Sequence, residues 1–574
     1  MKYSELADVY EELENTPSKL KKAEIISHVL RGAPPKLLPD LVLMLSGRVL
    51  PNWSEAEIGV ADKTAIKAIA KATGTAENDV VRLFSKVGDL GRVVEELVKK
   101  KSQRTLKGKT LDVETVHSNI ARLAETGGAG SQERKLSLLV ELISHASPRE
   151  ARYIIRTALG QLRIGVAEGI VRDAIASAFK VDADKVESAW FLRPHYGEIA
   201  EIAKEKGEAG LAKVRLEMGM PLMVQLAEKS PSLEEALGSF KRPTLQYKYD
   251  GMRTLVEKKG EKIWLYTRRL ENVTAAFPDI VAAVKKAVKA KDCIIDGEAL
   301  AIHPKTGKPQ PFQRLSQRIK RKYGVEQIAK EIPAQLNLFD VVYVNGKELF
   351  DLTLEERSAE LRKIVTPIPG KLKFADELVT TDLKKAKAFY EKALADGQEG
   401  LIVKNLDAKY MPGRRVAGGW LKVKPTMENL DLAIVGGLWG TGKRAGYIGS
   451  LILGCRDPDT GKFLECGMLG SGLLEKEGEE GTEKITLDKL TKMLRPLITS
   501  QKGGAIAIKP KIVIEVAYEE IQKSPTYTSG FALRFPRLIR MRPDKGPDEA
   551  DTKERLEALY AIQKGKSPKE TGEK

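Results

Sequence analysis

Hydrophobic residues recur at helical spacing through roughly the first 215 residues of the chain. Apolar side chains lie three or four positions apart there, as on one face of an amphipathic helix, and the strict alternation of a β-strand is scarce. The pattern therefore predicts an all-α N-terminal domain over residues 1–215. The clearest early set is Tyr3, Leu6, Tyr10 and Leu13.

The pattern changes to short apolar runs beyond residue 215. The runs at 293–295, 336–339 and 401–403 have the length of buried strands, and helix-like segments such as 280–284 separate them. This alternation predicts a mixed α/β (α+β) domain over residues 216–425.

Short strands separated by glycines follow from about residue 428. The runs at 432–436, 450–453 and 512–516 predict a small β-barrel over residues 426–574. A final helix is predicted over residues 549–563, where the apolar spacing is helical again.

The charge balance indicates what kind of partner the chain takes. Its 574 residues include 96 Lys and Arg and 79 Asp and Glu, so the net charge is 96 − 79 = +17. A basic chain of this size favours a polyanionic partner, nucleic acid first, because cations neutralise phosphates and release counterions. A soluble protein that is basic for another reason stays an open alternative.

Cysteine usage and hydropathy exclude several classes of protein. The three cysteines include no Cys-x-x-Cys pair, so this chain alone cannot build a four-cysteine zinc site. The amphipathic, acidic N-terminus is not a signal peptide, and no apolar run approaches the ~18 residues of a membrane span. We therefore expect a cytoplasmic protein without a membrane partner.

One short stretch, residues 248–253, gathers unusual chemistry between two expected strands. Its sequence is Lys-Tyr-Asp-Gly-Met-Arg. A lysine becomes a nucleophile when its pKa falls below its usual ~10.4, a glycine lets a phosphate approach, and an arginine can clamp that phosphate. Taken alone, the stretch also fits a surface hairpin with solvated charges.

Further motifs follow this turn in a fixed order over about half the chain. With Lys-x-Asp-Gly-x-Arg, their order resembles the covalent nucleotidyltransferases, which are ATP-dependent DNA ligases, RNA ligases and mRNA-capping enzymes. The whole chain resembles a replicative-type ATP-dependent DNA ligase of the archaeal and eukaryotic kind. The motifs lie at 267–272 (TRRLEN), 296–298 (DGE), 339–340 (FD), 399–404 (EGLIVK), 420–424 (WLKVK) and 534–545.

The resemblance implies an enzyme that seals nicks in double-stranded DNA, in replication, repair, recombination and cell division. It implies ATP and Mg²⁺ as cofactors, with Mn²⁺ as an alternative metal. AMP would pass from ATP to a lysine and then to the 5′-phosphate at a nick, before the 3′-hydroxyl attacks. The implied fold is an all-α DNA-binding domain, an α/β (α+β) nucleotidyltransferase domain and a C-terminal OB-fold β-barrel.

Four residues are assigned to catalysis. Lys248 would attack the α-phosphate of ATP, and Asp250 lies close enough in sequence to orient it. Lys422 and Lys424 are two apart in a predicted strand, so both point to one face. We expect their ammonium groups to depress the pKa of Lys248 and to neutralise the α-phosphate.

Carboxylates and arginines are assigned to the nucleotide and the metal. Glu298 and Glu399 offer the oxygen ligands that Mg²⁺ prefers, although the family uses such carboxylates for metal or ribose and both roles stay open. Arg253 and Arg268 are expected to hold phosphate or ribose oxygens.

Other residues are expected at the base and at the phosphates. Phe339 resembles the family residue that stacks on adenine. Gln246 stands where close relatives carry a base-recognising Glu; its amide could still bind adenine, but ADP and GTP stay open as nucleotides. Arg414 and Arg415 are equal candidates for one phosphate contact.

The last motif places cations on the barrel domain. In the family this domain swings over the ATP site to orient pyrophosphate and then rotates away to admit DNA. The resemblance assigns this role to Arg534, Arg542 and Lys545.

Four residues are expected to contact DNA. Lys135, Arg163 and Gly165 lie in stretches that resemble the family's minor-groove-binding domain, and such backbone contacts position a protein without reading bases. Arg318 lies in the basic stretch 312–322, for which an exposed helix face is the open alternative.

A sliding clamp is a candidate partner, with residues 37–45 as a candidate binding segment, and we expect a nucleoid-associated monomer. RNA ligases and other nucleotidyltransferases are the nearest alternatives, although the helical N-terminal domain argues against them. A non-catalytic nucleic-acid-binding protein is the alternative from another class; it would not need the lysines and carboxylates together.

Overall fold

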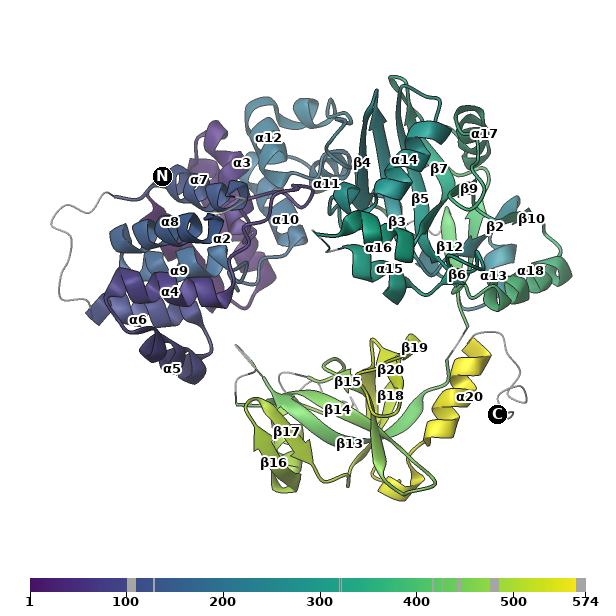
Figure 1. The fold of residues 1–574 in the computed structure, drawn as a ribbon. Coiled ribbons are helices and arrows are strands. Elements are labelled where there is room, and N and C mark those ends of the chain that lie inside the picture. The colour runs from purple at the N-terminus through teal and green to yellow at the C-terminus, as the bar shows by residue number, and fades with distance from the viewer. Residues whose placement is uncertain are drawn as a thin grey trace.

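The computed structural model describes residues 1–574 except 101–109, 127–129, 320, 322, 416–417, 426, 441–443, 445, 475–484 and 564–574. The chain forms a helical region, a region of two β-sheets and a sheet-rich C-terminal region (Figure 1). The first two lie side by side in this view, and the third lies below them. The predicted fold class is confirmed: helices first, a mixed region next and strands last.

The N-terminal region consists of helices. Their bounds are α1 Tyr3–Asn15, α2 Lys19–Gly32, η1 Pro35–Leu37, α3 Leu38–Leu45, α4 Asp62–Thr73, α5 Glu77–Val87, α6 Leu90–Lys100, α7 Val113–Glu125, α8 Ser131–His145, α9 Pro148–Ala158, α10 Glu168–Phe179, α11 Ala183–Leu192 and α12 Tyr196–Leu211. Local sequence sets where several begin: Ser147 and Glu150 form a capping box at α9, and Asp182 caps α11.

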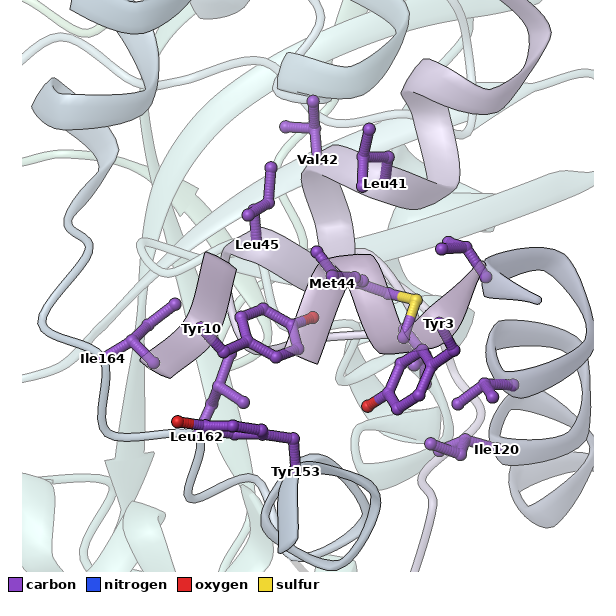
Figure 2. Packing of buried hydrophobic residues seen from close by; sticks show 14 of the residues in the cluster. Tyr3, Tyr10, Leu41, Val42, Met44, Leu45, Ile120, Tyr153, Leu162 and Ile164 are labelled. Atoms are coloured by element: carbon purple, nitrogen blue, oxygen red, sulfur yellow. The ribbon is translucent and has the colours of Figure 1, made fainter. Parts of the chain in front are cut away.

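The apolar faces of these helices share one core (Figure 2). The face predicted for the first helix is fully buried, and Tyr10 of α1 packs on Tyr153 of α9 with ring centroids 5.0 Å apart. The predicted helical periodicity is therefore confirmed at the start of the chain.

The segment 37–45 is part of this core. Leu38, Leu41 and Met44 are fully buried, and Figure 2 shows Leu41, Met44 and Leu45 among the packed side chains. A partner cannot reach side chains that the protein's own core covers. The expectation that this segment binds a clamp is therefore wrong.

The middle region contains two sheets. The five-stranded sheet has the order β1 Glu228–Lys229, β12 Trp420–Val423, β11 Gly400–Asn405, β2 Pro243–Lys248 and β10 Glu377–Val379. The other has the order β4 Lys262–Thr267, β3 Met252–Lys259, β5 Asp292–Ile302, β7 Ala334–Val344 and β8 Lys347–Glu348, with β6 Pro309–Gln310 beside β5 and β9 Leu372–Phe374 beside β7.

Helices cover the outer faces of both sheets. They are α13 Leu233–Gly238, η2 Thr274–Ala276, α14 Pro278–Ala287, α15 Phe312–Ile319, α16 Val325–Glu331, α17 Leu354–Ile364 and α18 Leu383–Ala395. Leu245 and Tyr247 of β2 share a core with α13 and α18. Because side chains alternate along a strand, Gln246 and Lys248 face the other way, toward the second sheet.

The C-terminal region is built mainly of antiparallel strands. Its elements are β13 Leu430–Trp439, β14 Ile448–Arg456, β15 Phe463–Leu469, α19 Leu487–Leu494, η4 Arg495–Leu497, β16 Ile498–Lys502, β17 Ala505–Ile508, β18 Val513–Ala517, β19 Glu520–Lys523, β20 Phe531–Arg534, β21 Arg537–Met541, η5 Pro547–Glu549 and α20 Lys553–Gln563. The predicted strands and final helix are confirmed, although α20 begins four residues later than expected. Among the described residues, no helix is long and apolar enough to cross a bilayer.

Candidate active site

The turn after β2 lies between the two sheets. Lys248 ends β2, and Gly251 precedes β3. A Cβ atom at Gly251 would lie 2.5 Å from the Ala299 carbonyl oxygen and 2.9 Å from Cγ of Glu298. Only glycine fits such a close approach, so this turn can lie against β5.

Lys248 forms an ion pair with Glu399, the residue before β11. Its Nζ lies 2.7 Å from Oε2 of Glu399, and Nζ of Lys424 lies 2.5 Å from the same oxygen. Strand pairing sets this geometry, because Gly400 lies opposite Lys248 and the Glu399 amide donates to the Lys248 carbonyl at 2.9 Å. Sequence-distant motifs thus meet around one carboxylate.

The protonation of Lys248 differs from our expectation. Burial lowers its pKa, but the negative charge of Glu399 and their hydrogen bond outweigh burial, so the pKa of Lys248 is raised. The prediction that neighbouring lysines depress it is therefore wrong for this state of the protein. Burial tends to raise the pKa of Glu399, but Lys248 and Lys424 lower it to about 2.

For two neighbours of this pair, the pKa shifts favour the neutral form of the side chain instead of the charged form. Burial raises the pKa of Glu298 to about 8, although Lys248 and Arg253 act against it. Burial, together with Lys248 and Lys424, lowers the pKa of Lys422. The described residues contain no cluster of three His, Cys, Asp or Glu side chains for a metal. A divalent cation would therefore need other oxygens besides Glu298 and Glu399.

Arg253 is held by protein groups. Its Nε and Nη2 donate to the two oxygens of Asp296 at 3.0 and 2.5 Å, and its Nη1 donates to the Gln225 carbonyl at 2.6 Å. A phosphate contact by Arg253 stays a prediction, and it requires these bonds to exchange. Arg268 is exposed; burial of part of its side chain and the nearby Arg253 lower its pKa.

Lys404 is a site residue that the sequence analysis did not select. Its Nζ lies 4.2 Å from the ring centroid of Phe339 and 4.1 Å from that of Trp420. Burial lowers the pKa of Lys404 to about 7. The signal was present in the sequence, because Lys404 follows Gly400 and Ile402 at strand spacing and so faces the same side.

Phe339 and Gln246 lie at the same space between the sheets. Phe339 packs on Trp420 at 5.9 Å between ring centroids. Gln246 is buried, and its Nε2 donates to Oε2 of Glu377 at 3.2 Å. Both positions suit the predicted base contacts, which stay predictions.

The two adjacent arginines point to different neighbours. Nη2 of Arg414 donates to the Ser188 hydroxyl of the helical region at 3.4 Å. Arg415 lies near Arg268 and Lys422, whose pKa values its charge lowers. Arg415 is therefore the better-placed candidate for a nucleotide phosphate.

The cations of the last motif contact carboxylates. Arg534 pairs with Glu520 at 3.2 Å, and the charges of Glu399 and Asp250 also raise its pKa, after Glu520, against the effect of burial. Arg542 and Lys545 both bind Asp431 at 2.7 Å. The structure thus places Arg534 toward the central site and holds the other two cations within their own region.

Two predicted DNA contacts are corrected by burial. The Arg318 side chain is fully buried; it bonds both oxygens of Asp279 and the carbonyls of Ala276 and Ile332. Lys135 is also buried, and its Nζ donates to the Ile58 carbonyl at 2.6 Å. Both side chains stabilise the fold, so the prediction that they contact a DNA backbone is wrong.

Arg163 and Gly165 remain accessible on an irregular loop. Both have left-handed backbones, with φ values of 59° and 66°, and both are exposed. Nζ of Lys22 donates to the carbonyls of Ile164 and Gly165 from inside. This support presents the loop at the surface, so a DNA contact here stays a prediction.

This fold, with a lysine and carboxylates between two sheets and further regions on either side, defines a class: the covalent nucleotidyltransferases. Residues 2–176 match the family described as DNA ligase N terminus, 224–424 the ATP dependent DNA ligase domain, and 444–545 the ATP dependent DNA ligase C terminal region. The chain therefore belongs to the ATP-dependent DNA ligase family, whose function is to seal nicks in DNA.

Relatives of similar length support this membership. A DNA ligase of Thermococcus onnurineus (strain NA1) is 44% identical over 98% of both chains. A DNA ligase of Nanoarchaeum equitans (strain Kin4-M) is 44% identical over 98% of this chain and 99% of its own. The solved structure named Pmar-Lig_PreS3 has the same fold, with a TM-score of 0.54, 19% identity, and coverage of 93% of this chain and 99% of that one.

Proposed function

We propose that this chain seals nicked duplex DNA through an AMP bound to Lys248. The observation that carries this assignment is the position of Lys248: between the sheets, ion-paired with Glu399 and beside Glu298 and Lys422. A lysine attack on the α-phosphate releases pyrophosphate and forms a P–N bond, and positioned cations stabilise the charge on the phosphate oxygens.

Glu298 and Glu399 are the proposed Mg²⁺ or Mn²⁺ ligands. Mg²⁺ is commonly bound by one or two carboxylates together with substrate phosphates, so a site without a third carboxylate suits it. The cation would supply charge neutralisation at the phosphates. A cation would also favour the ionised form of Glu298, whose burial opposes ionisation.

Lys422, Lys424, Arg268 and Arg415 are proposed to hold phosphates, and Asp250 to orient the turn. Arg534, Arg542 and Lys545 are proposed to act when the C-terminal region covers the bound ATP. We further propose a nucleoid-associated cytoplasmic monomer that binds nicked DNA partly through Arg163 and Gly165. A sliding clamp remains a proposed partner, bound by a segment other than 37–45.

The test is the intact mass of the protein after incubation with ATP and Mg²⁺. Wild type should gain one AMP, Lys248→Ala should gain none, and Lys409→Ala, which removes an exposed lysine, should behave like wild type. The labelled wild type should then seal a nicked DNA duplex. A stable AMP adduct on Lys248→Ala would refute the assignment of the nucleophile.

A further inference from the structure

Gln246 lies beside the proposed nucleophile, inside the protein. It precedes Lys248 by two positions on β2, so the two side chains share a face with about 6.6 Å between their Cα atoms. Gln246 is only 4% exposed. Phe339, Phe374 and Glu377 line a small cavity together with it. The Gln246 amide therefore lies next to aromatic side chains and near the proposed nucleophile.

Glu377 fixes the orientation of the Gln246 amide. The two residues are directly opposite each other on β2 and β10, and Nε2 of Gln246 donates to Oε2 of Glu377 at 3.2 Å. An ionised carboxylate only accepts hydrogen bonds, so the nitrogen end of the amide must face it. Arg362 forms an ion pair with the other oxygen, Oε1 of Glu377, and thereby holds the carboxylate in place.

The oxygen end of the amide is consequently what remains for a ligand. Among the residues that the structure describes, none donates a hydrogen bond to Oε1 of Gln246. This oxygen can therefore accept a hydrogen bond from a ligand.

We propose that Glu377 is a positioning residue that makes the site selective for adenine. It acts by turning Oε1 of Gln246 toward the exocyclic amino group of the base. Guanine carries a carbonyl oxygen at the corresponding position, and two facing acceptors cannot form a hydrogen bond. This inference rests on the proposed function, because it assigns the base of the nucleotide that Lys248 attacks.

The inference also explains how the chain works with Gln at position 246. A glutamate there would present two acceptor oxygens but would stand beside the Glu377 carboxylate. With Gln at position 246, the amide oxygen is the acceptor for the ligand. The Glu377 carboxylate binds the amide nitrogen and so fixes the orientation of the amide. Swapping the amide and the carboxylate between positions 246 and 377 should therefore preserve base selectivity, whereas changing either residue alone should not.

The experiment measures the rate of nucleotide attachment to the protein with ATP and with GTP. The variants are Glu377→Gln, Gln246→Glu and the double variant Gln246→Glu/Glu377→Gln. Glu377→Gln should reduce the ATP-over-GTP selectivity about tenfold, mainly through KM for ATP, because a glutamine at 377 lets the amide turn either way. Gln246→Glu should slow both reactions, since it places two carboxylates together.

The double variant should recover most of the ATP selectivity, since it again faces a carboxylate with an amide. Glu360→Gln, which removes a carboxylate paired with Lys363 at the surface, is the matched control and should keep the wild-type ratio. An unchanged ATP-to-GTP ratio in active Glu377→Gln, or no recovery in a folded double variant, would overturn the assignment alone. No attachment of either nucleotide to wild type would overturn the proposed function as well.

Discussion

A single carboxylate, Glu399, sets the charge state of the proposed nucleophile. It lies within 2.7 Å of Nζ of both Lys248 and Lys424, and it is the largest influence that raises the pKa of Lys248. A protonated amine cannot attack phosphorus. The ion pair must therefore weaken when nucleotide binds, and a cation bound at Glu399 would weaken it by competing for the carboxylate.

This leads to a prediction about pH. Glu399→Gln removes the charge that raises the pKa of Lys248, so burial and the nearby lysines should lower it. The deprotonated amine then forms at lower pH, and the midpoint of the pH–rate profile for AMP attachment should move to lower pH. The maximal rate should also fall, because Glu399 is a proposed metal ligand.

Asp396→Asn is the control for that experiment. Asp396 accepts a hydrogen bond from the Tyr247 hydroxyl at 3.0 Å, on the other face of the same sheet. Its variant should leave the midpoint where it is. A midpoint that stays fixed or rises in Glu399→Gln would show that Glu399 does not control Lys248.

At the scale of elements, a buried arginine attaches α15 to the second sheet region. Arg318 of α15 binds Asp279 of α14 with two hydrogen bonds, and it also reaches carbonyls at the end of η2 and after α16. Four parts of the chain thus depend on one guanidinium. Only the exposed basic residues of α15, such as Arg314, are available at the surface.

Arg318→Ala should therefore lower the free energy of unfolding by about 3–5 kcal/mol, because it leaves the Asp279 charge without its buried partner. Urea unfolding measures this loss. Arg314→Ala, on the exposed side of the same helix, should cost less than about 0.5 kcal/mol. Equal stability of the two variants would contradict the structural role of Arg318.

At the scale of the whole molecule, two residues proposed to bind ATP, Arg542 and Lys545, form ion pairs within the C-terminal region. Asp431 binds Arg542 and Lys545, and Asp544 binds Arg542 as well. These bonds must break before either cation can reach pyrophosphate.

Arg542→Ala should consequently slow AMP attachment at least about tenfold while nicks that already carry AMP are sealed at the wild-type rate. Arg540→Ala, which breaks a neighbouring pair with Glu515, should affect neither step strongly. The measurement is the rate of AMP attachment and, separately, the rate of sealing of nicks that already carry AMP. An equal loss in the two assays would contradict a role confined to the first step.

The net charge of +17 predicts that the affinity for DNA depends strongly on salt concentration. Binding of a nicked duplex should weaken by about a thousandfold between roughly 50 and 200 mM salt, since each phosphate contact releases counterions. Fluorescence anisotropy over that range gives the slope. Affinity that barely changes with salt would contradict phosphate-dominated binding.

The sequence by itself determined the order of the three regions and the set of chemical groups. Helical spacing, strand-length apolar runs and glycine-separated strands are local properties, so they indicated the elements correctly. Motif order likewise selected Lys248, Glu298 and Glu399, because their residue types and succession need no knowledge of the fold.

Only the tertiary structure decided which charges are exposed and which are paired. A basic run such as 312–322 looks uniform in sequence, yet packing buries Arg318 and leaves Arg314 at the surface. The pKa of Lys248 depends on Glu399, which strand pairing brings beside it from 151 positions away. The separate pairing of β2 with β10 joins Gln246 to Glu377. Contacts between distant strands are fixed by register and burial, which no local pattern records.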